Sequence, residues 1–227
     1  MAADAALLGL AIVLTLAAGL GLANYDTLAT GRAWRVRAPA RPGAVALLIG
    51  FGVAALVTGN FAGNFFLLPA AAVAALSGLA ILRRGGRLTS FGILWASADL
   101  VVLALDAEIP AFGAAWADVA FTALLLACFC SLLREIDVAG SYGWFVALAA
   151  AGVTAALCYR FDHADDATLA VLVTGAVFAI IASAPFGGGM LGRVGARFLG
   201  LVIGGMAIRA AVGSPVAVVT VAALGVL

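Results

Sequence analysis

Arginines gathered in four short segments are the residues of this chain whose type and spacing could do chemistry. All 12 basic residues are arginine, and most stand near glycine or proline. A guanidinium fork matches two oxygens of a phosphate, and consecutive glycines can offer backbone N–H groups to an anion. We therefore predict a site for a lipid phosphate or a related anion. Its candidate residues are Arg32, Arg35, Arg37, Arg41, Arg84, Arg87, Arg134, Gly192, Arg193 and Arg197. The same residues could act only as topology signals that touch anionic head groups.

One carboxylate, Asp137, lies in the third of these segments, close to Arg134. A carboxylate at a membrane edge can ligate Mg²⁺ or act as a base. It can equally cap a helix or pair with an arginine. Asp137 is therefore the catalytic candidate only on the condition that the protein is an active enzyme, and Mg²⁺ is expected only on the same condition. No residues have the spacing of a zinc site, and no metal site is predicted.

Three ionisable residues, Asp99, Asp118 and Arg209, fall inside apolar runs. A carboxylate at the centre of a membrane span costs about 2.5–3.5 kcal/mol on insertion scales, so it normally faces the protein interior. These residues could form a proton or cation relay. Alternatively, Arg209 pairs with one aspartate or extends toward the membrane surface, and the aspartates are hydrogen-bonded. The candidate partners for such bonds are Trp95, Ser97 and Thr122.

The elements that must position these residues are membrane-spanning helices. Of the 227 residues, 66% are hydrophobic and only 10% are charged, whereas a soluble domain is about 45–50% apolar and about 25% charged. A crossing helix needs about 20 mostly apolar residues. The pattern predicts an all-α, polytopic transmembrane helical bundle of about nine spans, forming a single domain over residues 1–227. The expected spans are 5–25, 43–60, 64–82, 89–106, 113–132, 142–159, 166–184, 197–212 and 214–227.

The arginines also predict the orientation of the chain. Ten of the 12 fall in alternate loops on one side of the expected spans, and the opposite loops are acidic. The positive-inside rule places the arginine-rich loops in the cytoplasm and the N-terminus outside. The lack of lysine and the abundance of alanine and glycine are typical of a GC-rich bacterial genome, so we expect a multi-pass inner-membrane protein. Membrane lipids are the expected partners, and a net charge of +1 gives no basis for binding nucleic acid.

Small residues within the spans are interpreted as packing residues. Gly200 and Gly204 stand four apart, a spacing that lets two helices approach closely. Asp166, at the start of the seventh span, is interpreted as a helix cap. The cysteines lie in apolar runs and are predicted to be small core residues. They are Cys128, Cys130 and Cys158.

The order and spacing of the four segments resemble one family, the polyprenyl-phosphate N-acetylhexosamine-1-phosphate transferases (MraY/WecA-like membrane enzymes). In the family frame after the first span, N-x-R-x-x-H-x-x-P-x-P-x-x-G-G, Arg32 and Arg35 take the places of the Arg and the His. After the third span the basic turn is kept as 83–87. After the fifth span Asp137 takes the place of the first Asp of N-x-x-N-x-x-D-G-x-D-G. Before the eighth span, residues 190–200 follow the frame F-x-G-D-x-G-S with Arg193 in place of the Asp.

This resemblance implies a multi-span helical protein with cytoplasmic active-site loops, a UDP-sugar and polyprenyl phosphate as substrates, and Mg²⁺. The chain departs from the family at the acids. Apolar residues 79–82 replace the Asp-Asp pair, Gly140 stands at the second Asp of the third segment, and the late His-rich loop is missing. Mg²⁺ requires oxygen ligands, and phosphoryl transfer relies on it for charge neutralisation. An arginine at a former Asp position would repel the metal.

The leading hypothesis is therefore a truncated, catalytically degenerate relative, with no cofactor. It would bind a lipid phosphate or serve as a partner subunit in cell-envelope glycan assembly, as a homodimer or within a larger membrane complex. A second hypothesis is an active divergent transferase that uses Asp137. A third is a transporter or a structural subunit of a membrane complex.

Overall fold

A computed structural model of the chain describes residues 9, 13, 49, 53, 87–139, 141–161, 164–183 and 192–212. These residues are helical apart from the connections between helices, and the described part contains no strand. Its continuous helices are α4 (Arg87–Leu105), α5 (Ala115–Ala139), α6 (Ser141–Arg160), α7 (Ala164–Ser183) and α8 (Gly192–Ala211). They fall on the fourth to eighth expected spans, which confirms the all-α prediction for this part of the chain. The other expected spans lie outside the described residues, and the number of nine stays a prediction.

Two expected loops are helical. α5 was expected to end near residue 132, but it continues to Ala139, and α6 begins at Ser141. Arg134 and Asp137 therefore lie on the last turns of a helix and not in a loop. α8 was expected to begin at residue 197, but it begins at Gly192. The predictions failed because the charged residues of these segments interrupt the apolar run without interrupting the backbone hydrogen bonds of the helix.

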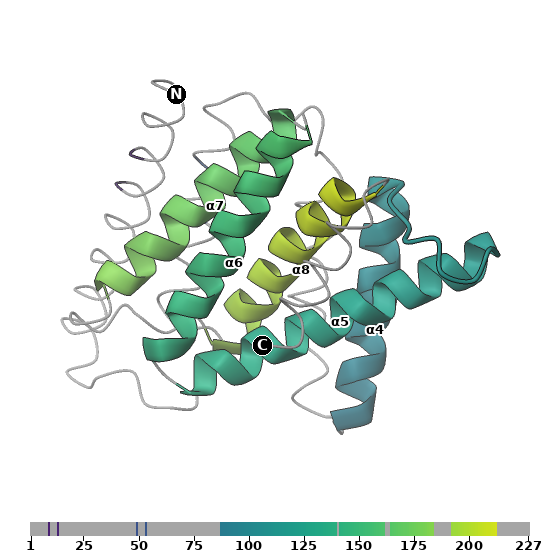
Figure 1. Ribbon diagram of the computed structural model, residues 1–227. Coiled ribbons are helices and arrows are strands. Elements are labelled where there is room, and N and C mark those ends of the chain that lie inside the picture. The colour runs from purple at the N-terminus through teal and green to yellow at the C-terminus, as the bar shows by residue number, and fades with distance from the viewer. Residues whose placement is uncertain are drawn as a thin grey trace.

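α6, α7 and α8 run alternately up and down side by side, and α5 runs obliquely across α4 (Figure 1). Short connections join α4 to α5, α5 to α6 and α6 to α7. α8 runs antiparallel to α5, because Gly200 of α8 approaches Cys130 while Gly204 approaches Leu126. The starts of α4, α6 and α8 consequently share one end of the bundle with the C-terminal ends of α5 and α7.

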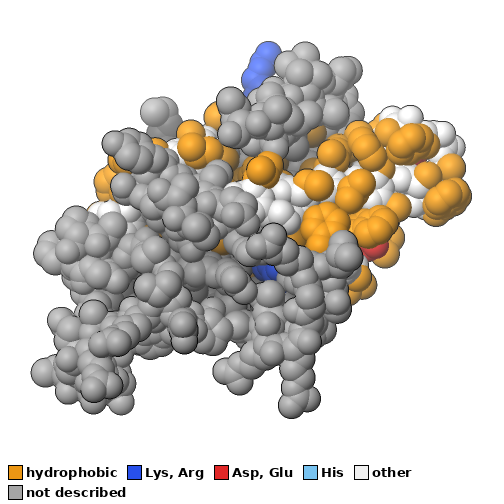
Figure 2. All heavy atoms as spheres, turned by 90° about the horizontal axis from the view of Figure 1, so that it is seen from below, with side chains coloured by type: hydrophobic (Ala, Val, Ile, Leu, Met, Phe, Trp, Pro, Cys, Tyr) orange, Lys and Arg blue, Asp and Glu red, His pale blue; other side chains and the backbone are white. Residues whose placement is uncertain are grey.

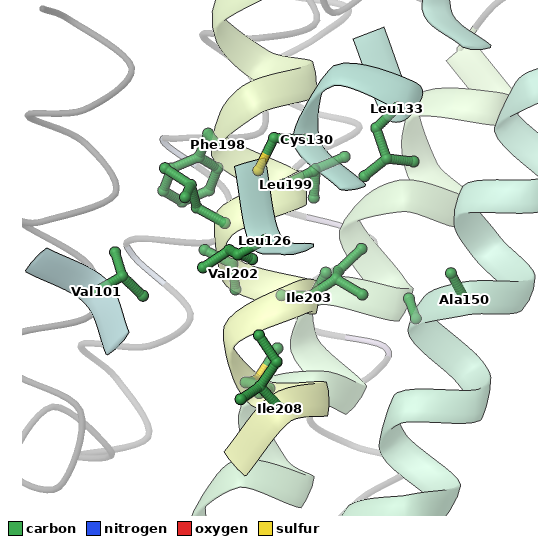
Figure 3. Close-up of a cluster of buried hydrophobic side chains, with 14 of the residues drawn as sticks. Val101, Leu126, Cys130, Leu133, Ala150, Phe198, Leu199, Val202, Ile203 and Ile208 are labelled. Atoms are coloured by element: carbon green, nitrogen blue, oxygen red, sulfur yellow. The ribbon is translucent and has the colours of Figure 1, made fainter. Parts of the chain in front are cut away.

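α8 is the central helix of the described bundle. It contacts each of α4, α5, α6 and α7, and every residue of 195–211 except Arg209 is buried. Its side chains Phe198, Leu199 and Ile203 pack into a core with Leu126 of α5 (Figure 3). Other helices complete this core with residues such as Val101 of α4 and Ala150 of α6. Close packing of these apolar side chains stabilises the bundle through many dispersion contacts.

Glycine allows α5 and α8 to approach closely. A Cβ atom built at Gly200 would lie 2.8 Å from both the Cα and the Sγ of Cys130, and one at Gly204 would lie 2.5 Å from Leu126 Cδ1. Real Cβ atoms essentially never come this close to another heavy atom. Gly200 therefore requires glycine at the observed helix separation, because it faces backbone, whereas a Cβ at Gly204 would have to displace the end of the Leu126 side chain. The predicted packing role of Gly200 and Gly204 is confirmed.

The outer surface of the described helices is largely apolar. On the face seen in Figure 2, most of the described side chains at the surface are hydrophobic. Leu100, Leu103, Phe145 and Phe178 are among the exposed large apolar residues. Exposed apolar surface on this scale is not typical of a soluble monomer. It fits helices that meet lipid.

By length and composition, α5 is the described helix that could cross a membrane, through Ala115–Leu133. Shorter apolar stretches lie in the neighbouring helices, at Phe91–Leu103, Phe145–Arg160 and Asp166–Ala182.

The cysteines are divided between the core and the surface of the described helices. Cys130 and Cys158 are buried, as predicted, whereas Cys128 is exposed on α5 and the prediction of a core position for it was wrong.

Candidate functional site

The alternation of the helices puts the predicted phosphate-binding residues of the described part on the same side of the bundle. Arg87 begins α4, Arg134 lies near the C-terminal end of α5, and Arg193 and Arg197 lie on the first two turns of α8. The antiparallel contact of α5 and α8 brings the end of α5 close to the start of α8, whereas α4 begins away from both (Figure 1). Asp137 lies on the last turn of α5 at this same end. The remaining candidates, Arg32, Arg35, Arg37, Arg41 and Arg84, lie outside the described residues.

Arg197 differs from a typical surface arginine because it is buried, with 3% of the residue exposed. It lies one turn before Gly200, where α8 is closest to α5. A buried guanidinium must be compensated by charges or hydrogen-bond acceptors. Arg197 therefore belongs to the interior of the bundle near its arginine-rich end. This placement adds a packing role to the phosphate contact that the sequence predicts.

Asp118 occupies the opposite end of the bundle, in the first turn of α5, where it holds the connection from α4. Its Oδ1 accepts hydrogen bonds from the backbone N–H groups of Ala111, at 2.9 Å, and Phe112, at 2.6 Å. Thr122, one turn later, accepts the N–H of Ile109 at 2.9 Å and donates to the Asp118 carbonyl at 2.7 Å. Of the two sequence interpretations, the hydrogen-bonded Asp describes this residue.

Arg209 pairs with Asp166, and the predicted pairing with Asp99 or Asp118 was wrong. The Nε atom lies 3.3 Å from Asp166 Oδ2, and Nη1 donates to Oδ1 at 3.4 Å. The fork-to-fork contact joins the last turn of α8 to the first turn of α7. Asp166 is 2% exposed and Arg209 is 35% exposed. The sequence interpretation treated Asp166 only as a cap, because nothing in the sequence indicates that these helix ends meet.

Asp99 stands apart from the other ionisable residues of α4 and α5. Its Oδ1 atom is buried and has no hydrogen-bond partner among the described residues. Neither predicted partner on α4 bonds to it. The Ser97 hydroxyl donates to the Ile93 carbonyl at 2.7 Å, and the Trp95 indole donates to the Ala120 carbonyl of α5 at 3.2 Å. Asp99, Asp118 and Arg209 therefore do not contact one another as the relay interpretation requires, because Asp118 and Arg209 each have other partners.

The described residues hold no cluster of three or more His, Cys, Asp or Glu side chains that could bind a metal ion. Comparisons of the chain with family models, with curated proteins and with solved structures found no match. The resemblance to the sugar-phosphate transferases accordingly rests on the residues quoted above. Within the described part, the main chemical feature is the separation of polar groups. Four of the described arginines lie on one side of the bundle, and the partly exposed Arg209–Asp166 ion pair and the buried Asp118 lie at the other end.

Proposed function

We propose that this chain is a multi-pass protein of a bacterial inner membrane whose arginine-rich end binds the phosphate of a membrane lipid. It would be a catalytically degenerate relative of the polyprenyl-phosphate sugar-phosphate transferases, acting as a lipid-binding or partner subunit in cell-envelope glycan assembly. The observation that carries the proposal is the antiparallel contact of α5 and α8, which brings the helix end that carries Arg134 and the helix start that carries Arg193 to the same place in the bundle. These residues are far apart in the sequence and come from two of the predicted segments.

The electrostatics of that end favour an anion without a metal. Four arginine positions share it with two acidic positions of the described part, Glu135 and Asp137. An arginine forms a charge-assisted hydrogen bond with phosphate that contributes about 1.5–3 kcal/mol. A lipid phosphate could reach this end laterally because the surrounding helix surfaces are apolar. The end therefore offers charge for the head group next to apolar surface for the chain.

A lipid-binding experiment tests the proposal directly. The purified full chain would be titrated with undecaprenyl phosphate in detergent, and binding would be followed by native mass spectrometry. We expect Arg134→Gln and Arg193→Gln each to weaken binding about tenfold, which corresponds to one charge-assisted hydrogen bond. The matched control is Arg160→Gln, because Arg160 ends α6 at the opposite end of the bundle. Equal losses in all three variants, or no binding by the parent chain, would contradict the proposal.

An activity assay separates the degenerate relative from an active one. The chain would be incubated with a UDP-sugar, polyprenyl phosphate and Mg²⁺, and release of UMP would be measured. We expect no release above the background. If UMP is released, the chain is an active transferase, and Asp137→Asn then decides whether Asp137 takes part. Unchanged turnover in that variant would remove Asp137 from the mechanism.

A second candidate function, proton or cation transport, is favoured by one observation. The buried, unpartnered Oδ1 of Asp99 lies on α4 within an apolar stretch, and an ionisable group in such a place is often functional. In vesicles containing the chain, transport would collapse ion or pH gradients faster than in empty vesicles, and Asp99→Asn would abolish the difference. Equal decay in the parent chain and Asp99→Asn excludes a transport role for Asp99.

A further inference from the structure

The connection between α4 and α5 exposes an uncharged apolar segment at the arginine-poor end of the bundle. Residues 110–116 read Pro-Ala-Phe-Gly-Ala-Ala-Trp and contain no charged side chain. Phe112 is 65% exposed and Trp116 is 79% exposed. A connection in water normally presents polar side chains, since nothing compensates the exposure of large aromatic surface. The composition and exposure of residues 110–116 thus indicate an environment that is less polar than water.

The N–H groups at the start of this connection are bonded within the protein. The N–H groups of Ala111 and Phe112 donate to the Asp118 carboxylate, and the N–H of Ile109 donates to Thr122. Residue 110 is proline and has no N–H group. Backbone near the hydrocarbon of a membrane requires partners for its polar groups within the protein. Asp118, itself buried, supplies such a partner for Ala111 and Phe112.

The exposed aromatic side chains are held in fixed positions. The ring of Phe112 packs edge-to-face on Phe121 of α5, with centroids 5.4 Å apart and planes at 89°. Trp116 lies in the first turn of α5. The segment is continuous with the apolar surface of α5, the described helix that is long and apolar enough to cross a membrane. Tryptophan and other aromatic residues at such helix ends are enriched at the membrane–water interface.

We infer that residues 110–116 insert into the head-group region of the bilayer and anchor the N-terminal end of α5 there. The partner is the lipid surface, and the contact is made by Phe112 and Trp116. This inference rests on the proposed membrane embedding of the chain. Asp118 and Thr122 are positioning residues in this account, because they fix the segment and do not touch the lipid.

Fluorescence quenching in vesicles tests the depth of the segment. The full chain would be placed in phosphatidylcholine vesicles carrying a nitroxide either near the head group or near the end of the acyl chain. The difference in emission between the parent chain and Trp116→Phe isolates Trp116 and keeps the other tryptophans. We expect the shallow nitroxide to quench Trp116 about twice as strongly as the deep one. Ala111→Trp adds a second tryptophan to the segment. The shallow nitroxide should also quench this tryptophan more strongly than the deep one does.

Each alternative gives a different result. Quenching of Trp116 by aqueous acrylamide, with no effect of either nitroxide, places the segment in water and overturns the inference. Protection from both kinds of quencher places it under a second copy or another protein and also overturns it. Leu125→Trp tests the embedding itself, because Leu125 is exposed on α5 and lies about 14 Å along the helix from Trp116. If the deep nitroxide does not quench the tryptophan at position 125, the proposed membrane embedding of the chain is wrong, and not only the inferred depth of residues 110–116.

Discussion

Asp118 contributes to stability through the two backbone amides that it accepts at 2.9 and 2.6 Å. Asp118→Ala removes the acceptor of both N–H groups, which belong to the exposed residues Ala111 and Phe112. We expect the free energy of unfolding to fall by about 1.5–3 kcal/mol, the usual contribution of a hydrogen bond to a charged group. Denaturant titration in detergent micelles measures the loss, and hydrogen exchange should show faster exchange at Ala111 and Phe112.

Two further variants serve as comparisons for the stability loss expected in Asp118→Ala. Asp118→Asn keeps an acceptor oxygen in the same place and should recover part of the lost stability. Glu108→Ala removes a carboxylate from the same connection, where no hydrogen bond to the side chain is described, and should change stability by less than about 0.5 kcal/mol. If Glu108→Ala is as destabilising as Asp118→Ala, the stability of the connection does not depend on the Asp118 amide contacts.

The ion pair between Arg209 and Asp166 makes a second prediction at this scale. Asp166 is almost fully buried, whereas Arg209 is partly exposed. Solvent screening at the arginine reduces the strength of the pair. A double-mutant cycle of Asp166→Asn and Arg209→Gln should therefore give a coupling energy in the lower part of the usual 0.5–3 kcal/mol range, about 1 kcal/mol. Arg160→Gln is the matched control, because Arg160 is an exposed arginine at the same end of the bundle, and its coupling to Asp166→Asn should be near zero.

At the scale of elements, the most buried helix, α8, is not the most apolar one. α8 contains three arginines and several glycines, yet it is the most completely buried described helix. In water the most apolar helix would be the central one. In a membrane the outer helices need an apolar surface toward lipid, and the central helix needs small residues for close packing. The composition of α8 is therefore further support for the proposed membrane embedding.

Gly200 tests the close approach of α5 and α8. In Gly200→Ala the new methyl group meets the Cys130 backbone at 2.8 Å, and backbone cannot move aside without separating the helices. We expect a loss of about 1–3 kcal/mol in unfolding free energy, measured by denaturant titration. Gly204→Ala should cost less, because its contact is the flexible end of the Leu126 side chain.

Gly152→Ala provides the control for this experiment. A Cβ at Gly152 of α6 meets nothing within 4 Å, so the substitution should raise stability by up to about 1 kcal/mol through helix propensity. Cys130→Ala in the Gly200→Ala background should recover stability only in part, because it removes Sγ but keeps Cα. Full recovery would show that the side chain, and not the backbone, sets the distance between the helices.

The sequence predicts the five described helices because each contains a long apolar run, and it predicts the role of Gly200 and Gly204 from their spacing. It misplaces the ends of α5 and α8, because Arg134 and Arg193 are read as loop residues although a helix tolerates them. It does not predict the Arg209–Asp166 pair or the amide contacts of Asp118. Both depend on which helix ends meet in space, and the apolar pattern carries no such information.

For the whole molecule, the alternation of the helices and the distribution of charge give one topology. Arg87, Arg134, Arg193 and Arg197 share one end of the described bundle. Asp106, Glu108, Asp118, Asp165 and Asp166 lie at the other end, with Arg160 and Arg209. For the proposed membrane embedding, the positive-inside rule predicts that the arginine-rich end faces the cytoplasm. In that arrangement α5 connects the two ends, and its direction would set the orientation of the neighbouring helices.

Cysteine labelling of the full chain in spheroplasts tests this topology. Glu108→Cys lies in the connection before α5, and Ser141→Cys lies directly after it. A membrane-impermeant maleimide should label Glu108→Cys in intact spheroplasts and Ser141→Cys only after permeabilisation. The parent chain gives the background, which should be low because Cys130 and Cys158 are buried and Cys128, exposed on the apolar surface of α5, would face lipid. Labelling of both positions from the same side would show that α5 does not cross. The opposite order would keep the crossing but place the arginines outside, and the proposed binding of a cytoplasmic lipid phosphate would then be wrong.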